Sequence, residues 1–538
     1  MSVSQIKAAA IKPFTHLTLA ALAVLILAAI FQTVPGYMDA EYYDAGGLQL
    51  VHGQGFNEPF LWNYLDQPAG IPHPSHTYWM PLASILAYLG MKITGAGTFL
   101  AARWPFLLLA ALIPWLTYRL ANILGAKPAS ARLAGWLAVF PGFYLIFTTL
   151  TETFVLYMLG GTLFFILLSL NDERWRNRFF WIRYGLLGLL AGWMHVSRAD
   201  GALWLGLAGL VWLVETIQEA RARGLNWRRA GVGVILLGMG YLLLMGAWFT
   251  RNLSLSGTLF SPGGSRTLWL TSYDQTYTFQ AGALTFQNWL AAGWGAALKA
   301  RWNALVLNLK NLLAVQGSVF LLPFILIGAW KKRQCTIVRW GALGWLLTLL
   351  VMTVVFPFSG GRGGFLHSGA AFQPLGWACA AIGLETAIDA GAARFGWQRG
   401  TAWRVFSGGA VALAALLTAG VFWMRVAQPG MDGPLWNASD RAYRQAGEQL
   451  NALGIADSEL CMVNNPPGFF LATGRSSIVI PDGEEEELLA AARRYGAKIL
   501  ILDSNNPALD DLYRHATANS NFQFLSAIGS MNIYRISP

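Results

Sequence analysis

The chain has 538 residues, of which 55% are hydrophobic and only 12% are charged, whereas a soluble domain is usually about a quarter charged. Apolar runs of about 20 residues, the length that crosses a hydrocarbon core of roughly 30 Å, recur through most of the chain. The formal net charge is +11, but the basic residues are scattered in short loops between apolar runs. That pattern is typical of membrane orientation and argues against a nucleic-acid partner.

The cysteines and the N-terminal apolar run exclude two further classes. Cys335, Cys379 and Cys461 are too widely spaced for a disulfide framework or a thiolate metal site. The first apolar run follows Lys7 and Lys12 and reaches Pro35 without the small-residue cleavage site of a signal peptide. We therefore expect it to be retained as the first membrane span.

Hydropathy predicts about eleven membrane spans. We expect them at residues 14–34, 99–123, 130–148, 152–170, 181–196, 200–217, 229–249, 312–330, 339–357, 366–388 and 405–425. The break at 195–200 decides the sidedness of all later loops, because without it the two short spans would merge into one helix.

Charge favours that break. With it, the basic loops at Lys127 and Arg132, at Arg174, Arg176, Arg178 and Arg183, at 221–229, at 331–339 and at 394–404 share one side. Loops rich in Lys and Arg stay in the cytoplasm. The sequence thus predicts a multi-pass plasma-membrane protein of a prokaryote, with a cytoplasmic N-terminus and an extracytoplasmic C-terminal segment.

Two outer loops, at about 35–98 and 250–311, are long and contain the amphipathic stretches 82–93 and 289–307. Such stretches can lie along the membrane interface. Residues 427–538 form a separate, more polar region, with expected strands at 460–463, 477–480, 498–502 and 531–536 and a helix at 484–495. The expected fold class is a polytopic α-helical membrane domain (1–426) followed by a soluble α/β domain (427–538).

Three carboxylates, those of Asp39, Glu41 and Asp44, follow the first span directly. Partial desolvation at the outer membrane surface would raise their pKa and suit them to acid/base work. The alternative is an ordinary solvated acidic loop. Later in the same loop, His73 and His76 could bind a metal ion, but Pro74 between them argues against a shared helical face, so polar loop histidines are the favoured interpretation.

The remaining outer turns carry Glu152, then His195, Arg198 and Asp200, then Arg251, and finally Arg362 and His367. Each has a simpler explanation, such as a helix N-terminal charge for Glu152 or an interhelical ion pair for Arg198 and Asp200. Together they predict a polar cavity that opens outward, because ionisable groups at membrane depth face a cavity or the bundle interior. Arginines beside carboxylates suit an anionic leaving group and a nucleophilic hydroxyl.

From about residue 14 to 425 the sequence resembles the GT-C membrane glycosyltransferases that use polyprenyl-phosphate sugars. These include the dolichyl-phosphate-mannose protein mannosyltransferases and the bacterial lipid A aminoarabinose transferases. The resemblance rests on Asp39-Ala40-Glu41-Tyr42-Tyr43, Gly53-Gln54-Gly55-Phe56, Ala101-Ala102-Arg103-Trp104-Pro105, Ser197-Arg198-Ala199-Asp200-Gly201, Arg251-Asn252 with Gly257, and Arg362 with His367 and Pro374.

The resemblance implies an inverting sugar transfer from a polyprenyl-phosphate donor to an acceptor protein, lipid or glycan. It places the catalytic base at Asp39, but Ala40 stands where the family often has Glu, which leaves the share of Glu41 open. Arg198, Arg251 and Arg362 would bind the lipid phosphate, and Glu152 would be a second acidic group. Further substrate-binding candidates are Tyr43, His73, His76, His195, Asp200 and His367. A divalent metal ion is compatible with this pattern, but nothing in the sequence requires one.

Two other classes compete with this interpretation. A transporter or flippase of lipid-linked saccharide would show repeats and polar groups near mid-span, whereas here no repeat is evident and the polar groups cluster at one face. A non-catalytic protein that displays its C-terminal domain would bind a glycan through residues 430–538 alone.

Overall fold

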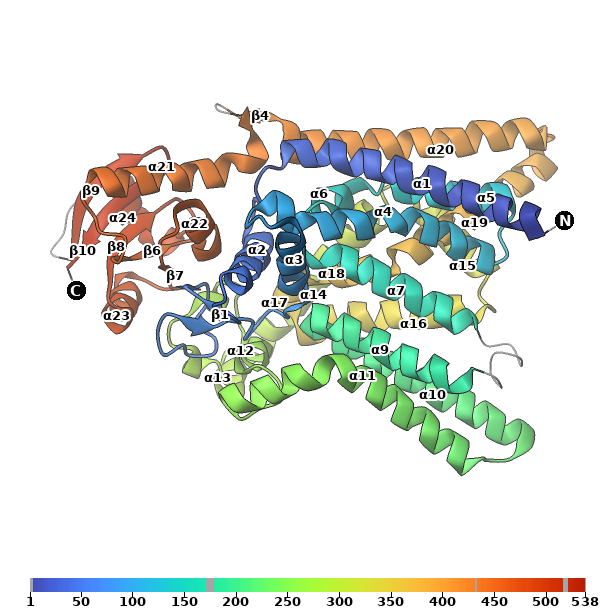
Figure 1. Cartoon of the computed structure of the whole chain (residues 1–538), viewed down its shortest axis with the longest axis horizontal. Helices are drawn as coiled ribbons and strands as arrows, with labels where there is room; N and C mark the ends of the chain where they lie inside the picture. Colours follow the sequence, from blue (N-terminus) through green and yellow to red (C-terminus); the bar gives the residue numbers. More distant parts are fainter. Residues whose placement is uncertain (1–2, 171–178, 431–432, 516–520, 538) are drawn as a thin grey trace. The chain divides into compact units, whose positions relative to one another are not determined.

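The computed structural model describes residues 3–170, 179–430, 433–515 and 521–537 (Figure 1). Arg174, Arg176 and Arg178 of one predicted basic loop lie outside these residues. The chain divides into two compact units. Unit 1 comprises Met1–Ile30, Phe106–Leu259 and Arg301–Arg425, and unit 2 comprises Phe31–Pro105, Phe260–Ala300 and Val426–Pro538.

Unit 1 is helical, and each predicted span overlaps at least one of its helices. Those helices are α1 (Val3–Phe31), α4 (Phe99–Ile123), α5 (Pro128–Val139), α6 (Leu145–Thr148), α7 (Thr153–Ser169), α9 (Phe180–Ser197), α10 (Ala202–Arg223), α11 (Trp227–Ser256), α15 (Leu322–Lys331), α16 (Thr336–Leu350), α18 (Phe365–Gly369), α19 (Gln373–Phe395) and α20 (Arg399–Phe422).

The structure supports the predicted helical membrane protein, but with fewer candidate spans than the eleven expected. Among the described residues, six helices are long and apolar enough to cross a membrane. A seventh span results if Pro128–Val139 and Gly142–Thr148, which are bent by 47°, count as one. α7 and α15 are apolar but shorter. The chain is thus a mostly helical membrane protein with six or seven candidate spans, because several predicted runs are divided between short or bent helices.

The expected break between residues 195 and 200 is present. α9 ends at Ser197, Arg198 is extended with φ −154° and ψ 146°, and a 3-10 turn over Ala199–Gly201 leads into α10. Gly201 permits this return, since a Cβ built there would lie 2.1 Å from the Met194 carbonyl oxygen.

Glycines bring α9 and α11 together, and Figure 1 shows the two helices side by side in green. A Cβ at Gly188 of α9 would lie 2.0 Å from the carbonyl oxygen of Leu237, and one at Gly240 of α11 would lie 2.1 Å from that of Gly185. Small residues at helix contacts let backbones approach closely, which is how helices associate in membranes.

Unit 2 is built on a six-stranded mixed sheet in the order β2-β7-β6-β8-β10-β9. β2 (Phe60–Leu61), β7 (Ser477–Val479), β6 (Leu460–Val463) and β8 (Ala497–Leu502) are parallel, and β10 (Met531–Ile536) pairs antiparallel with β8 and with β9 (Phe522–Ile528). The helix expected at 484–495 is α23 (Glu485–Tyr495). The predicted mixed α/β character of residues 427–538 is therefore present.

Helices cover both faces of this sheet. Leu488 and Ala492 of α23 pack in one apolar core with Met462 and Leu500. The other core holds α21 (Ala438–Ala452) and α22 (Pro466–Thr473) against residues such as Val463 and Ile501. The strand residues alternate between the two cores, as side chains on successive strand positions must.

The region predicted to be the first outer loop adds helices α2 (Met38–Val51) and α3 (Leu82–Thr94), which pack together, and a short hairpin of β1 (Asn57–Glu58) with β3 (His73–Pro74). Of the amphipathic stretches predicted for the interface, 82–93 is α3, and 289–307 falls on α13 (Phe286–Ala291) and α14 (Gly293–Asn311). Trp436 donates a hydrogen bond to the Val34 carbonyl over 3.1 Å. This hydrogen bond joins the C-terminal domain to the segment that directly follows α1.

Candidate functional site

α2 carries the acidic motif. It begins at Met38, so that Asp39 and Glu41 lie in its first turn, where carboxylates interact favourably with the helix dipole. Asp39 is partly buried, whereas Glu41 and Asp44 are 3% and 4% exposed. Of the three carboxylates, that of Asp39 is the most accessible to a substrate.

The two buried carboxyls of α2 have shifted pKa values. Burial raises the pKa of Glu41 to about 7, against a hydrogen bond from the side chain of Asn465 that lowers it, and Asp440 and Asp39 add a smaller increase. Burial also raises the pKa of Asp44 to about 8, with a further contribution from the charge of Glu41. These groups can hold protons near neutral pH.

Tyr43 and His76 lie where α2 meets α3. His76 pairs through Nδ1 with the Ser75 hydroxyl at 2.8 Å and through Nε2 with the Ser84 hydroxyl at 3.0 Å. Ser84 in turn donates to the Tyr43 carbonyl at 3.0 Å, and the His76 amide donates to the Tyr42 hydroxyl at 2.6 Å. His76 therefore links α2 to α3 through hydrogen bonds. A contact between His76 and substrate stays a prediction.

His73 has a different partner. Its Nε2 lies 2.9 Å from Oδ2 of Asp66. Burial alone would raise the pKa of Asp66, but the hydrogen bond and charge of His73, together with hydrogen bonds from Thr77 and the backbone, leave that pKa below its usual value. Since His73 and His76 bind different groups, the structure does not join them as a pair of metal ligands.

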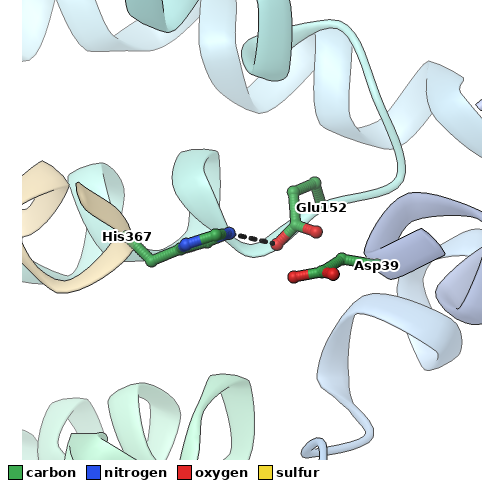
Figure 2. Close-up of side chains that lie close together, drawn as sticks. All are labelled: Asp39, Glu152 and His367. Carbon is green, nitrogen blue, oxygen red and sulfur yellow. Dashed lines mark ion pairs between the residues drawn. The ribbon is translucent and has the colours of Figure 1, made fainter. Parts of the chain in front are cut away.

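Glu152 and His367 form an ion pair inside unit 1 (Figure 2). Glu152 caps α7, where its Oε1 accepts from the Thr153 amide at 2.6 Å, and it is completely buried. His367 Nε2 lies 3.4 Å from that Oε1, and its ring stacks on Phe154 with 4.1 Å between centroids. The other ring nitrogen, Nδ1, lies 2.9 Å from the Gly363 carbonyl oxygen and donates a hydrogen bond to it. This hydrogen bond fixes the ring with Nε2 directed at the Glu152 carboxylate.

Glu152 and His367 together have some of the properties of a metal-binding site. Within the described residues Oε2 of Glu152 is buried without a hydrogen-bond partner, and a carboxylate beside an imidazole nitrogen is a donor set that Zn²⁺ accepts. Structural and catalytic zinc sites take at least three protein ligands. The two groups therefore fit a divalent ion without defining its site.

Asp200 joins three elements of unit 1. Its Oδ1 accepts from Nε of Arg198 at 2.9 Å, and its Oδ2 accepts from the hydroxyls of Tyr157 of α7 at 3.2 Å and Ser368 of α18 at 2.6 Å. Both oxygens are thus engaged by protein. Arg198 and Asp200 do form an ion pair, within the turn between α9 and α10 and not between two helices, and it orients the arginine by its Nε.

Three further predicted groups of unit 1, His195, Arg251 and Arg362, have other surroundings. His195 Nδ1 pairs with the Tyr241 hydroxyl of α11 at 2.5 Å and is 2% exposed, which favours a role in helix packing. Arg251 was expected in a turn after the span at 229–249; this is wrong, because α11 continues to Ser256, and the guanidinium of Arg251 lies 4.5 Å from the Trp248 ring centroid. Arg362 is exposed within the glycine-rich π-helical turn Gly360–Gly364.

Three polar residues were missed by the sequence reasoning: Tyr157, Ser368 and Asn465. Tyr157 and Ser368 contact Asp200 from distant parts of the chain, and nothing local marks them. Asn465 had a signal, since Asn followed by Pro466 and Pro467 is a typical start of a helix.

Comparisons with known proteins found one matching family and several similar structures. Residues 73–248 match the family described as dolichyl-phosphate-mannose-protein mannosyltransferase, and this segment contains Glu152, His195, Arg198 and Asp200. No curated protein sequence matches significantly.

Solved structures share the fold at low sequence identity. ArnT from Cupriavidus metallidurans, bound to undecaprenyl phosphate, is 11% identical with 97% of each chain covered and a TM-score of 0.55. The Archaeoglobus fulgidus oligosaccharyltransferase in complex with Zn and sulfate is 14% identical, with 97% of this chain and 72% of that chain covered and a TM-score of 0.60. The same archaeal enzyme, AglB, with an inhibitory peptide and a dolichol-phosphate is 13% identical over 90% of this chain and 69% of that one, at a TM-score of 0.54.

Proposed function

We propose that this chain is a multi-pass membrane glycosyltransferase, similar to the matched mannosyltransferase family, and that it transfers a sugar from a polyprenyl phosphate to an acceptor at the outer face of the membrane. The family match over residues 73–248 carries the proposal. The lipid phosphates named with ArnT and AglB support this class of donor, and the peptide named with AglB supports an acceptor bound beside it.

The reaction exchanges one bond at the anomeric carbon for another. The acceptor oxygen or nitrogen forms a bond to that carbon while the bond to the phosphate oxygen breaks, and its electron pair leaves with the polyprenyl phosphate. The proton of the acceptor passes to a carboxylate. Attack from the face opposite the leaving phosphate inverts the anomeric configuration. Phosphate needs no protonation to leave at neutral pH, so one base is sufficient.

Asp39 is our candidate for that base. It is more exposed than Glu41 and Asp44, and burial raises the pKa of Glu41 to about 7, so Glu41 is partly protonated where the reaction would run. A general base is worth about 10²- to 10⁴-fold in rate. Of the two carboxyls considered for catalysis, we therefore assign proton transfer to Asp39 and a supporting role to Glu41.

The donor phosphate would be bound by Arg198, Arg251 and Arg362. Arginine presents several N–H donors in a rigid planar fork that matches phosphate oxygens, and it keeps its charge at any working pH. Asp200 supports this role by fixing Arg198 through Nε. Glu152 and His367 supply a carboxylate and an imidazole that would bind the sugar hydroxyls or a divalent ion, and such an ion would neutralise charge on the leaving phosphate.

The decisive experiment compares Asp39→Asn with the native protein in a purified assay, using a radiolabelled polyprenyl-phosphate sugar and extracts of candidate acceptors. We expect at least about a hundredfold loss of transfer, in line with removal of a general base. Asp274→Asn, which changes an exposed outer-loop carboxyl, is the control. Full activity in Asp39→Asn would exclude Asp39 as the base, and lipid movement across proteoliposomes without any transfer would favour a flippase.

A further inference from the structure

The side chain of Asn465 connects the C-terminal domain to the acidic helix α2. Asn465 follows β6 and caps α22, where its Oδ1 accepts from the Gly468 amide at 3.2 Å. Its Nδ2 donates to Oε2 of Glu41 at 2.6 Å. One amide group thus contacts the first turn of α22 and the first turn of α2.

At the start of α22, the group that donates to Glu41 is the Asn465 side chain. Pro466 and Pro467 have no backbone N–H, and the Gly468 N–H is already bound by Asn465. The two helices are also in close contact here, because a Cβ built on Gly468 would lie only 2.7 Å from Oε2 of Glu41. Residues Asn465-Pro466-Pro467-Gly468 therefore form a small surface against which the Glu41 carboxyl group packs.

Both partners of this hydrogen bond are firmly held. Asn464, beside Asn465, donates to Asp503, which follows β8, so the ends of two neighbouring strands are joined. On the other side α2 is fastened to α3 through Tyr43, Ser84 and His76. Glu41 lies only two positions beyond Asp39 on the same helix, so a rotation of α2 at Glu41 also moves Asp39.

We propose that Asn465 is a positioning residue, through which the C-terminal domain fixes the orientation of α2 and so of Asp39. The inference rests on the proposed function for its effect on transfer, but the contact itself is independent of the reaction. It gives the C-terminal domain a role in catalysis without any contact between that domain and the reacting atoms.

The test replaces the Asn465 amide, which donates a hydrogen bond to Glu41, with a carboxylate, which accepts hydrogen bonds. Asn465→Asp keeps the cap on α22, since Asp accepts from an amide as well as Asn does, but it sets two carboxyls against each other. We expect kcat to fall at least about tenfold with a small change in KM, because misplacement of a reacting group by about 1 Å can cost a hundredfold. Adding Glu41→Gln supplies a new N–H donor, and the double variant should recover to within about threefold of the activity of the Glu41→Gln single variant.

The pH profile separates positioning from general damage. When Glu41 is protonated it can donate to the carboxylate introduced by Asn465→Asp, so the defect of this variant should be small at about pH 6 and large at about pH 8.5. Asp39, Asp44 and Asp440 also act on this carboxyl, and their charges shift the midpoint in the same direction. The control is Asn521→Asp, which places the same substitution against Glu485 elsewhere in the domain and should leave kcat near native at both pH values.

A second measurement does not require activity. Amide hydrogen exchange in α2 should quicken in Asn465→Asp and return to native rates in the double variant. If exchange follows this pattern while the native protein transfers no sugar from any lipid phosphate, the positioning stands and the proposed function fails. If the double variant stays as slow in catalysis as Asn465→Asp, or if exchange in α2 is unchanged, the positioning role is wrong.

Discussion

The Ser368 hydroxyl donates a 2.6 Å hydrogen bond to the carboxylate of Asp200, which lies 168 positions earlier in the chain. Tyr157 and Arg198 donate to the same carboxylate. The side chain of Asp200 thus connects α7, α18 and the break that separates α9 from α10.

Replacement of Asp200 should destabilise the protein. Asp200→Ala leaves three donors without their acceptor in a partly buried network, and each unsatisfied buried donor costs about 1–3 kcal/mol. We expect a clear fall in the unfolding temperature in detergent. Asp389→Ala, which removes a more exposed carboxyl paired with Arg399, should barely change it. Equal losses in the two variants would mean that the Asp200 network contributes no more than a surface ion pair.

Gly201 should be essential to the break. A Cβ there would lie 2.1 Å from the Met194 carbonyl oxygen, so Gly201→Ala must shift backbone and should cost about 1–3 kcal/mol, as overpacking does. Gly206→Ala in α10 is the matched control, because nothing lies within 4 Å of a Cβ at that position. Unfolding temperatures of the two variants measure the difference, and an unchanged Gly201→Ala would contradict the packing described for the break.

The stability of unit 2 should fall as pH rises through neutrality. Burial raises the pKa of Glu41 from 4.5 to about 7 and that of Asp44 from 3.8 to about 8, so the folded state binds protons that the unfolded chain has released. Stability from these groups is complete below their unfolded pKa values and declines until about pH 8. In Asp44→Asn the unfolding temperature should depend less steeply on pH across this window. The exposed Asp274→Asn should keep the native slope, and a native slope in Asp44→Asn would refute the assignment.

Sidedness can be tested by labelling. We expect the C-terminal domain outside and the basic loops inside, because Lys- and Arg-rich loops stay in the cytoplasm. Cys335 is the one cysteine that is not buried, so Cys335→Ser gives a suitable background. In it, Ser504→Cys should react with an impermeant maleimide on intact cells, and Arg223→Cys only after permeabilisation. The opposite result would invert the proposed topology.

Local patterns in the sequence predicted the elements well where one physical rule dominates. The break at Ser197 and Arg198 followed from the distribution of positive charge over distant loops. Short apolar runs predicted β6, β7, β8 and β10 of the C-terminal domain, but not β9. The end of α11 was misplaced because polar residues do not by themselves end a helix. Polar Arg251 and Asn252 looked like a turn but extend the helix.

The candidate site was less predictable, because its contacts join residues that are far apart in sequence. The acidic motif and the arginines were visible as residue types. However, the partner of Glu41 lies 424 positions away, and the two residues Phe60 and Leu61 are too few to show strand periodicity. Only the fold reveals that β2 completes the sheet of the C-terminal domain, or that Asp200 is bound on both oxygens.

The place of β2 in that sheet also bears on the order of assembly. Phe60 and Leu61 pair with Ser477 and Ile478, and Tyr64 beside them donates to the Val479 carbonyl. During synthesis the first outer loop leaves the ribosome long before its partner strand exists, and the membrane helices are made in the interval. Its aromatic residues must therefore wait, exposed or loosely packed, until the last fifth of the chain arrives. The helices of unit 1 can thus form before β2 pairs with β7, so the two steps of folding are separate in time.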